Sequence, residues 1–319
     1  MVMSGKKALV LSGGSIKGSF QVGGIQAVLE SGFVPDFIYG ISVGALNGSF
    51  LCSEAGEQKK VVNKVDWEII GSDLVSFWKE NIKQPSDVIT QRSWLNVGAS
   101  ALFDDFNGIV GINPLEELIK KKISIQNLRL SPAELKIGAV NINNGAITYV
   151  NPVHSDFIEY LVASASTPIM MPIVKIDNQP FADGGVREIA PLKTAINSGA
   201  SDIIVIACQA HNMGGPIIDP KNIIQLIERV FDVMTTAIVD NDIELVQYFN
   251  RFLPDSGLPQ ETGPLSGYRK VRVRTIRPTT PINLDIRKFT QSDIEELIDQ
   301  GYQAGQKILQ PEPQFASRT

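Results

Sequence analysis

Ser42 stands between two glycines in the stretch Gly40-Ile41-Ser42-Val43-Gly44, at the end of a short apolar run and ahead of small residues. This spacing is typical of a nucleophile elbow, in which a strand turns sharply into a helix and holds a strained serine clear of the backbone. The N–H groups at the start of such a helix favour developing negative charge. With 27 glycines in the chain the pattern is weak alone, and it also fits an ordinary turn.

A serine hydroxyl needs a base before it can act as a nucleophile. The chain has two histidines, His154 and His211. In α/β-hydrolases the triad follows the order serine, acid, histidine, and only Ser42, Asp183 and His211 satisfy that order here. The topology fits poorly, because that fold places several strands before its elbow and only one strand-and-helix unit precedes Ser42.

The alternative base is the carboxylate of Asp183, in Asp183-Gly184-Gly185 at the end of an expected hairpin. The two glycines let the backbone crowd the site. A free aspartate has a pKa of about 4 and is a feeble base, so the site must raise that pKa by desolvation or rely on geometry. The tripeptide also fits a simple turn.

A tetrahedral intermediate needs an oxyanion hole, and a glycine-rich loop can supply it. Gly13 and Gly14 lie between the first strand and the first helix, so their N–H groups can point outward with no Cβ in the way. Ser15 breaks the dinucleotide-binding pattern, and no Gly-Lys-Ser/Thr follows, so a nucleotide phosphate is disfavoured. Lys17 and Gly18 are candidates for holding an anionic or substrate group; the alternative for Lys17 is a solvated lysine at a helix start.

Hydrophobic periodicity predicts the elements that position these residues. A strand over 7–11, a helix ended by Gly32 and a strand ending at Ser42 predict a parallel sheet with crossover helices. Residues 106–112 are predicted to pack normally, with a mobile cover over the site as the alternative. The remaining predictions are mostly helical residues over 45–127, strands over 135–142, 146–150, 173–176, 179–182, 202–207 and 271–276, and helices over 156–164, 191–197, 219–252 (broken once) and 291–309.

The composition bounds the class of protein. No linker divides the 319 residues, which predicts one domain over 1–319 with a core from about 7 to 210 and a C-terminal extension from about 211 to 319. The net charge of −5 argues against nucleic-acid binding. No apolar run is long enough for a membrane span or a signal peptide, so we expect a cytoplasmic protein that can meet a membrane peripherally. Cys52 and Cys208 have apolar neighbours and read as buried thiols, and no motif calls for a metal or cofactor.

Taken together, these motifs resemble the patatin-like phospholipase family. Gly13-Gly14-Ser15-Ile16-Lys17-Gly18 is similar to its oxyanion loop, Gly-Gly-Gly-x-Arg/Lys-Gly. Gly40-Ile41-Ser42-Val43-Gly44 is similar to its nucleophile elbow, and Asp183-Gly184-Gly185 to its Asp-Gly-Gly/Ala motif. Asn47 and the run Ala163-Ser164-Ala165-Ser166-Thr167-Pro168 also match positions of the family.

The resemblance implies a three-layer α/β/α fold with a mostly parallel central sheet, a nucleophile elbow and a helical cover. It implies a catalytic dyad, with Ser42 as the nucleophile and Asp183 as its base. The amides of Gly13, Gly14 and Ser15 would form the oxyanion hole.

The implied reaction is hydrolysis of fatty-acyl esters of lipids, at a membrane or micelle surface. Two alternatives stay open. One is a soluble esterase with a triad that includes His211. The other is a weakly active lipid-binding or regulatory protein on the same fold, which the presence of Ser15 in place of the third loop glycine favours.

Overall fold

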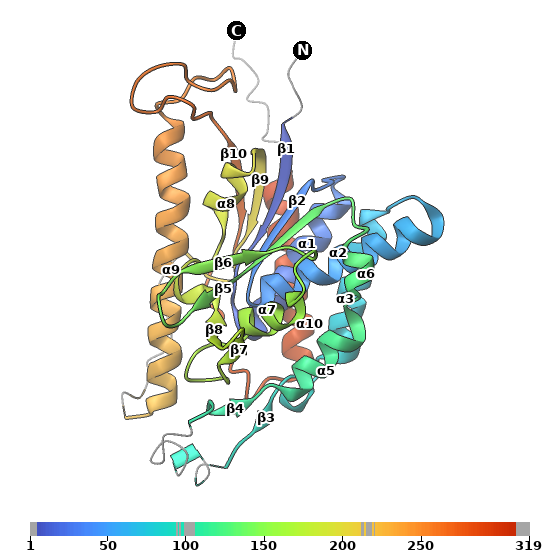
Figure 1. Ribbon diagram of the computed structural model, residues 1–319, viewed down its shortest axis with the longest axis vertical. Helices are drawn as coiled ribbons and strands as arrows, with labels where there is room; N and C mark the ends of the chain where they lie inside the picture. Colours follow the sequence, from blue (N-terminus) through green and yellow to red (C-terminus); the bar gives the residue numbers. More distant parts are fainter. Residues whose placement is uncertain are drawn as a thin grey trace.

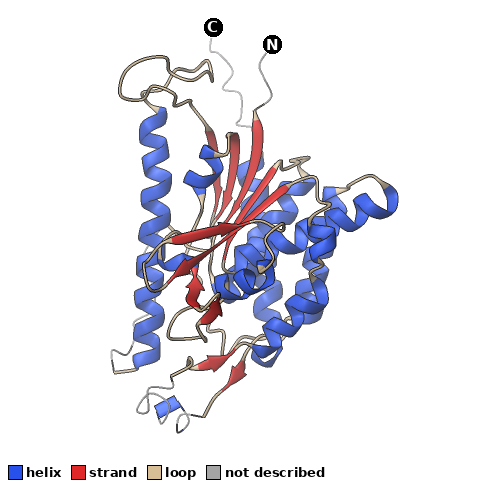
Figure 2. Cartoon of the chain, viewed as in Figure 1, coloured by secondary structure: helices blue, strands red, loops and turns tan. Residues whose placement is uncertain are grey.

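The computed structural model describes residues 5–93, 95, 97–98, 106–211, 214, 219 and 221–310. A central sheet runs through the molecule, and helices cover both of its faces (Figures 1 and 2). The three-layer α/β/α fold is therefore confirmed.

The main sheet is mostly parallel, as predicted, and its strand order is β10-β9-β1-β2-β5-β8-β7, with β6 paired to β5. The pairs from β10 to β5 are parallel, whereas β8 and β6 run antiparallel to β5. The strands are β1 (Lys6–Leu11), β2 (Phe37–Ile41), β5 (Glu134–Asn141), β6 (Ile147–Val150), β7 (Val174–Ile176), β8 (Gln179–Asp183), β9 (Ala200–Ile206) and β10 (Arg272–Ile276).

Strands β2 and β8 meet end to end along one edge of β5. β2 pairs with β5 as far as Ile41 opposite Gly138, and β8 pairs with the next residues, with Asp183 opposite Ala139. β6 pairs with residues 137–140 of β5 and so occupies the other edge. Because β2 and β8 approach from opposite directions, the residue after β2 and the last residue of β8 come together.

The helices divide between the two faces of the sheet. Along β1, Leu9 and Leu11 join the core formed with α1, α2, α3 and α10, and Ala8 and Val10 join the core formed with α8 and α9. The helices are α1 (Gly18–Glu30), α2 (Val43–Val62), α3 (Trp67–Asn81), α5 (Asn113–Lys122), α6 (Ile125–Leu128), α7 (Phe157–Ser164), α8 (Leu192–Asn197), α9 (Ile223–Asn250) and α10 (Gln291–Leu309).

The alternative of a mobile cover at residues 106–112 is not what the structure shows. Ile109 and Val110 are buried, and their N–H groups donate to the backbone of Ile169 and Met170. The segment belongs to a short ribbon of β3 (Thr90–Gln91) and β4 (Val110–Gly111). It therefore packs as part of the core, in line with the preferred prediction.

Helix α9 is one unbroken helix, so the predicted break within 219–252 is wrong. It lies along the outside of the sheet (Figure 1). No helix in the described part of the chain has the length and hydropathy that crossing a membrane requires. Cys52 and Cys208 are free and buried, as predicted.

Candidate active site

Ser42 occupies a sharp turn between β2 and α2. Its backbone has φ 55° and ψ −127°, a region that a non-glycine residue rarely adopts and that costs about 1–3 kcal/mol. The flanking glycines make room for this turn. A methyl group on Gly40 would lie 2.4 Å from the carbonyl oxygen of Gly44, and one on Gly44 would lie 2.3 Å from the carbonyl oxygen of Leu11. The local geometry is that of a nucleophile elbow.

A buried serine holds this turn in place. The N–H of Ser42 donates to Oγ of Ser164 at 2.9 Å, and that hydroxyl donates to the carbonyl of Gly138 at 2.7 Å. Ser164 thus ties the elbow to the end of α7 and to β5. Residues 163–168 are similar to the family in sequence, but that similarity did not predict the hydrogen bonds of Ser164.

Asp183 lies at the end of β8 with its side chain in a buried, hydrogen-bonded position. Asp183 is 6% exposed. The carboxylate accepts hydrogen bonds from the N–H of Gly185 at 2.8 Å and from the hydroxyl of Thr167 at 3.3 Å. Burial raises the pKa of Asp183 to about 6, against the lowering effect of hydrogen bonds from Gly185, Ser42 and Thr167. A carboxylate with this pKa is a better base than a free aspartate.

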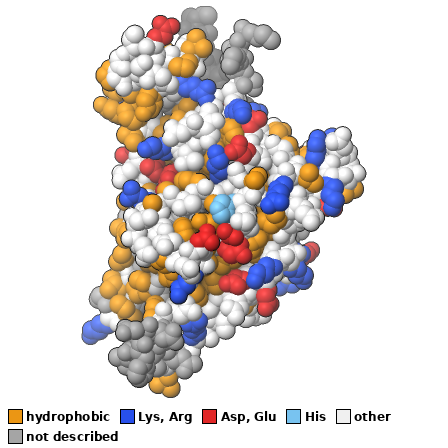
Figure 3. Space-filling view, viewed as in Figure 1, with side chains coloured by type: hydrophobic (Ala, Val, Ile, Leu, Met, Phe, Trp, Pro, Cys, Tyr) orange, Lys and Arg blue, Asp and Glu red, His pale blue; other side chains and the backbone are white. Residues whose placement is uncertain are grey.

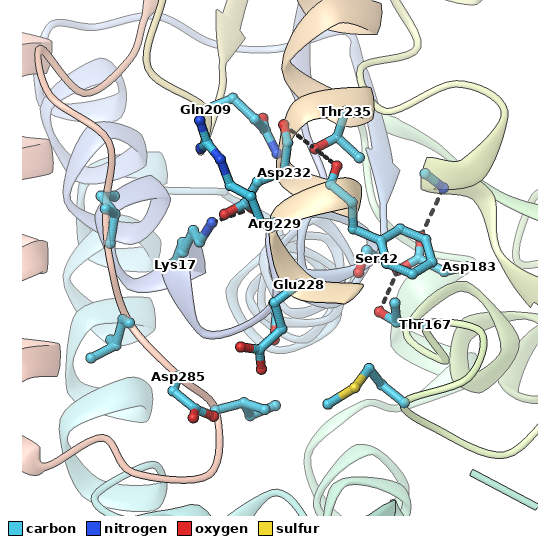
Figure 4. A pocket seen from close by; sticks show the side chains of 18 of the residues that line it. Lys17, Ser42, Thr167, Asp183, Gln209, Glu228, Arg229, Asp232, Thr235 and Asp285 are labelled. Atoms are coloured by element: carbon cyan, nitrogen blue, oxygen red, sulfur yellow. Dashed lines mark hydrogen bonds and ion pairs between the residues drawn. The ribbon is translucent and has the colours of Figure 1, made fainter. Parts of the chain in front are cut away.

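Ser42 and Asp183 face each other in one pocket (Figure 4). The Ser42 hydroxyl is among the groups whose hydrogen bonding lowers the pKa of Asp183. The meeting of β2 and β8 along β5 is what places the two side chains together.

Neither histidine lines this pocket. The side chain of His211 is 74% exposed, and its Nδ1 lies 3.4 Å from Oδ1 of Asp240 on α9. His154 contacts the ring of Tyr160, and its Nδ1 accepts the N–H of Asp156. The structure thus provides no imidazole base for Ser42, which removes the basis for the His211 triad.

The glycine loop leaves two of the three predicted oxyanion donors without a protein partner among the described residues. The N–H of Gly13 donates to the carbonyl of Ile189 at 3.0 Å, so including Gly13 among the donors was wrong. Gly14 and Ser15 line the pocket, and within the described residues their N–H groups have no protein partner. Gly14 must lack a side chain, because a methyl group there would lie 2.4 Å from Cβ of Cys208.

Ser15 adopts the backbone conformation that the family's third glycine would adopt easily. Its φ is 53°, in the left-handed region. Its side chain therefore adds backbone strain of about 1–2 kcal/mol without removing the residue from the pocket wall. The N–H of Val43, the first residue of α2, is a further candidate donor, because the first N–H groups of a helix have no intrahelical partner.

Two polar side chains that sequence reasoning missed hold the loop from behind. Nε2 of Gln209 donates to the carbonyl of Gly13 at 3.0 Å, and the hydroxyl of Ser12 donates to the same carbonyl at 2.9 Å. The N–H of Cys208 in turn donates to the Ser12 oxygen. Ser12 and Gln209 are buried, so these bonds are shielded from water.

Asn47 belongs to a second buried chain of hydrogen bonds that reaches the loop. Nε1 of Trp78 donates to Asn47 at 2.9 Å, and Asn47 donates to Oε1 of Gln21 at 3.0 Å. Gln21 then donates to the carbonyl of Ser12 at 3.1 Å. This chain links α3, α2 and α1 to the start of the glycine loop.

Lys17 and Gly18 have separate environments. Lys17 lines the pocket, and its Nζ lies 2.5 Å from Oδ1 of Asp232 on α9. Gly18 is not among the pocket residues, and a methyl group there would lie 2.1 Å from a methyl of Val43. Gly18 therefore allows α1 to pack on α2, and the prediction that it contacts substrate is wrong.

The pocket is a cavity of about 420 Å³ with one wall that the motifs did not reveal. That wall comes from α9 and from residues 282–288. Among the described residues, no group of three or more His, Cys, Asp or Glu is arranged to bind a metal. The charged lining residues other than Asp183 are Lys17, Glu228, Arg229, Asp232, Asp285 and Lys288, and the larger apolar ones are Met170, Met171, Val186, Ile189, Phe231, Ile282, Leu284 and Ile286.

Comparison with known proteins gives one family match and several distant relatives. The model of the patatin-like phospholipase family matches residues 9–196. Triacylglycerol lipase 5 of Saccharomyces cerevisiae is 25% identical over 246 residues, covering 68% of this chain and 31% of that protein. The uncharacterized protein YjjU of Escherichia coli is 24% identical over 215 residues, covering 63% and 52%. Neuropathy target esterase sws of Drosophila melanogaster is 44% identical over 46 residues, covering 14% and 3%. The chain thus spans at most about half the length of these relatives.

Proposed function

The chain belongs to the patatin-like phospholipase family, and from that premise we propose that it hydrolyses fatty-acyl esters of lipids through a dyad of Ser42 and Asp183. The substrate would be a phospholipid, lysophospholipid or related ester presented at a membrane or micelle surface. The observation that carries the proposal is the pairing of a strained serine with a buried carboxylate in one pocket, where neither histidine of the chain lies.

The dyad can take the reaction through an acyl-enzyme. Oγ of Ser42 attacks the ester carbonyl carbon, and its proton passes to the carboxylate of Asp183. The negative oxygen of the tetrahedral intermediate is held by the N–H groups of Gly14 and Ser15, at the start of the helical turn that precedes α1. The intermediate collapses, and the leaving alcohol takes the proton from Asp183.

Deacylation repeats these steps with water as the nucleophile. Asp183 accepts a proton from the water as it attacks the acyl carbon, and the second intermediate releases the fatty acid. The proton then returns to Oγ of Ser42. The same carboxylate serves both half-reactions, and burial suits it to this task because a pKa of about 6 lies close to neutral pH.

Two substitutions and one matched control test the dyad. Ser42→Ala and Asp183→Asn should each abolish turnover of a long-chain ester, because one removes the nucleophile and the other the base. His211→Ala should keep a near-normal rate, since that ring lies outside the pocket. Full activity in Ser42→Ala or Asp183→Asn, or loss of activity in His211→Ala, would refute the dyad.

A binding or regulatory role remains the second candidate, because Ser15 keeps a strained conformation where the family has glycine. A fluorophosphonate probe separates the two readings. We expect the folded wild-type chain to be labelled at Ser42, with no labelling of Ser42→Ala. Folded wild-type protein that resists labelling and turns over no ester would favour the binding role.

A further inference from the structure

Helix α9 carries apolar side chains on two sides: Ile224, Val239 and Ile243 are buried in the core, and a second apolar set is exposed. A helix on the surface of a globular protein turns its apolar stripe to the core and its charges to water. In the first half of α9 the acidic residues Glu228 and Asp232 are half-buried and pair with the body of the protein. Asp232 pairs with Lys17, and Glu228 lies 3.5 Å from a guanidinium nitrogen of Arg287.

The outward side of the same helix is uncharged from residue 223 to residue 243. Hydrophobic side chains follow the edge of the molecule in Figure 3 where Figure 1 places α9. Ile223 is 59% exposed, Val230 is 47% exposed and Met234 is 44% exposed. We define the α9 outer face as the exposed apolar residues of its first half, which are Ile223, Leu226, Val230, Val233 and Met234.

The α9 outer face adjoins the candidate active site. The same helix also lines the pocket. Its pocket-lining residues lie behind the outer face and are residues 225, 228, 231, 232 and 235. A molecule taken from a surface that covers the outer face would therefore meet the pocket across the width of one helix, about 10 Å.

Cations flank this face at the same end of the molecule. Lys221 is exposed just before α9, where its N–H donates to the exposed Asp219, and Lys288 is exposed at the pocket wall next to the Arg287–Glu228 pair. An apolar helical stripe beside lysines suits a lipid surface, because the stripe enters the boundary of the acyl chains while the ammonium groups contact anionic headgroups. Within residues 223–243 the exposed positions include no carboxylate that would oppose this contact.

We propose that the α9 outer face docks the protein on an anionic lipid bilayer, with the helix lying between the lipid and the pocket. The proposed function explains why the protein would meet lipid, and in that respect the docking proposal rests on it. Vesicle binding itself needs no catalysis. The helix would lie in the plane of the interface, and its inward ion pairs with Lys17 and Arg287 would keep it attached to the catalytic core.

The test uses vesicles of phosphatidylcholine with phosphatidylglycerol and the full chain. Val230→Glu/Met234→Glu places two carboxylates on the outer face, at positions outside the pocket lining. Val61→Glu is the matched control, because Val61 is an exposed valine (68%) on α2. We expect the double variant to lose about tenfold or more in vesicle partitioning and the control to change less than about twofold.

A soluble short-chain ester separates docking from catalysis. The double variant should hydrolyse that ester like wild type while losing activity on vesicles. Wild-type vesicle binding by the double variant would overturn the docking proposal. A lipid-free wild type that is dimeric, with a double variant that is monomeric, would also overturn it and assign the face to a second copy. Vesicle binding lost in the double variant, with no ester hydrolysed by wild type, would refute the proposed function and leave docking standing.

Discussion

Replacing Asp183 by asparagine should stabilise the fold at neutral pH while it abolishes catalysis. The carboxylate is buried, and burial raises its pKa from 3.8 to about 6. The folded state therefore binds the proton more tightly than the unfolded chain. The contribution of Asp183 to the stability of the fold is therefore highest below its pKa in the unfolded chain. It falls as the pH rises through its pKa in the folded protein. Asparagine has no charge to desolvate, so it escapes this loss.

The magnitude follows from the shift in pKa. A carboxyl with values of 3.8 unfolded and about 6 folded destabilises the fold by about 0.6 kcal/mol at pH 4, about 1.6 kcal/mol at pH 5 and about 3 kcal/mol at pH 7. The amide keeps the hydrogen bonds of the site, because its oxygen can accept the N–H of Gly185 and its NH₂ can donate to the Thr167 hydroxyl.

Urea unfolding of wild type and Asp183→Asn at several pH values measures this effect. The free energy of unfolding of the variant should exceed that of wild type, and the excess should grow by about 2 kcal/mol between pH 4 and pH 7. The comparison cancels the titration of all other groups. An excess that does not change with pH, or a variant less stable than wild type at pH 7, would refute the claim that Asp183 carries a buried charge.

Three further predictions address the base, the elbow and the loop. The kcat/KM for a soluble ester should fall about tenfold per pH unit below about pH 6 as Asp183 becomes protonated; a rate independent of pH between 4 and 7 contradicts this. Gly44→Ala should destabilise the fold by about 3 kcal/mol or more in urea unfolding, because its methyl group would meet the Leu11 carbonyl. The control is Gly71→Ala in α3, where the nearest neighbours of the new methyl group are 3.4 Å away. Its free energy of unfolding should rise by about 0.5–1 kcal/mol. Asn47→Ala should cost about 2–5 kcal/mol and lower kcat, because two buried partners lose their hydrogen bonds; an unchanged kcat would exclude its link to the glycine loop.

The sharp turn at Ser42 and the strand end at Asp183 were predictable because each is marked by its immediate neighbours. A strained turn needs small residues around it, so Gly40 and Gly44 mark Ser42 within five positions. The parallel sheet was predictable for a related reason, since short apolar runs alternate with helical periodicity. In each of these cases the constraint lies within a few residues of the chain.

The hydrogen bonds of the glycine loop and the outer wall of the pocket were not predictable in this way. Whether the N–H of Gly13 is free depends on the carbonyl of Ile189, which is remote in sequence and reaches the loop only through the fold. The same holds for Gln209, which supports that loop. The apolar periodicity of α9 predicted a helix correctly, but its outward direction depends on ion pairs to Lys17 and Arg287 that no local pattern records.

The energetics of the site weigh against a purely regulatory role. The backbone of Ser42 carries strain of about 1–3 kcal/mol, and ionisation of buried Asp183 costs about 3 kcal/mol at neutral pH. These two costs are large compared with the free energy of unfolding of a typical protein, which is about 5–15 kcal/mol. A binding protein would gain nothing from either, because asparagine would make the same hydrogen bonds to Gly185 and Thr167 without the buried charge. Both costs are accounted for if Asp183 acts as a base and the strained Ser42 acts as a nucleophile.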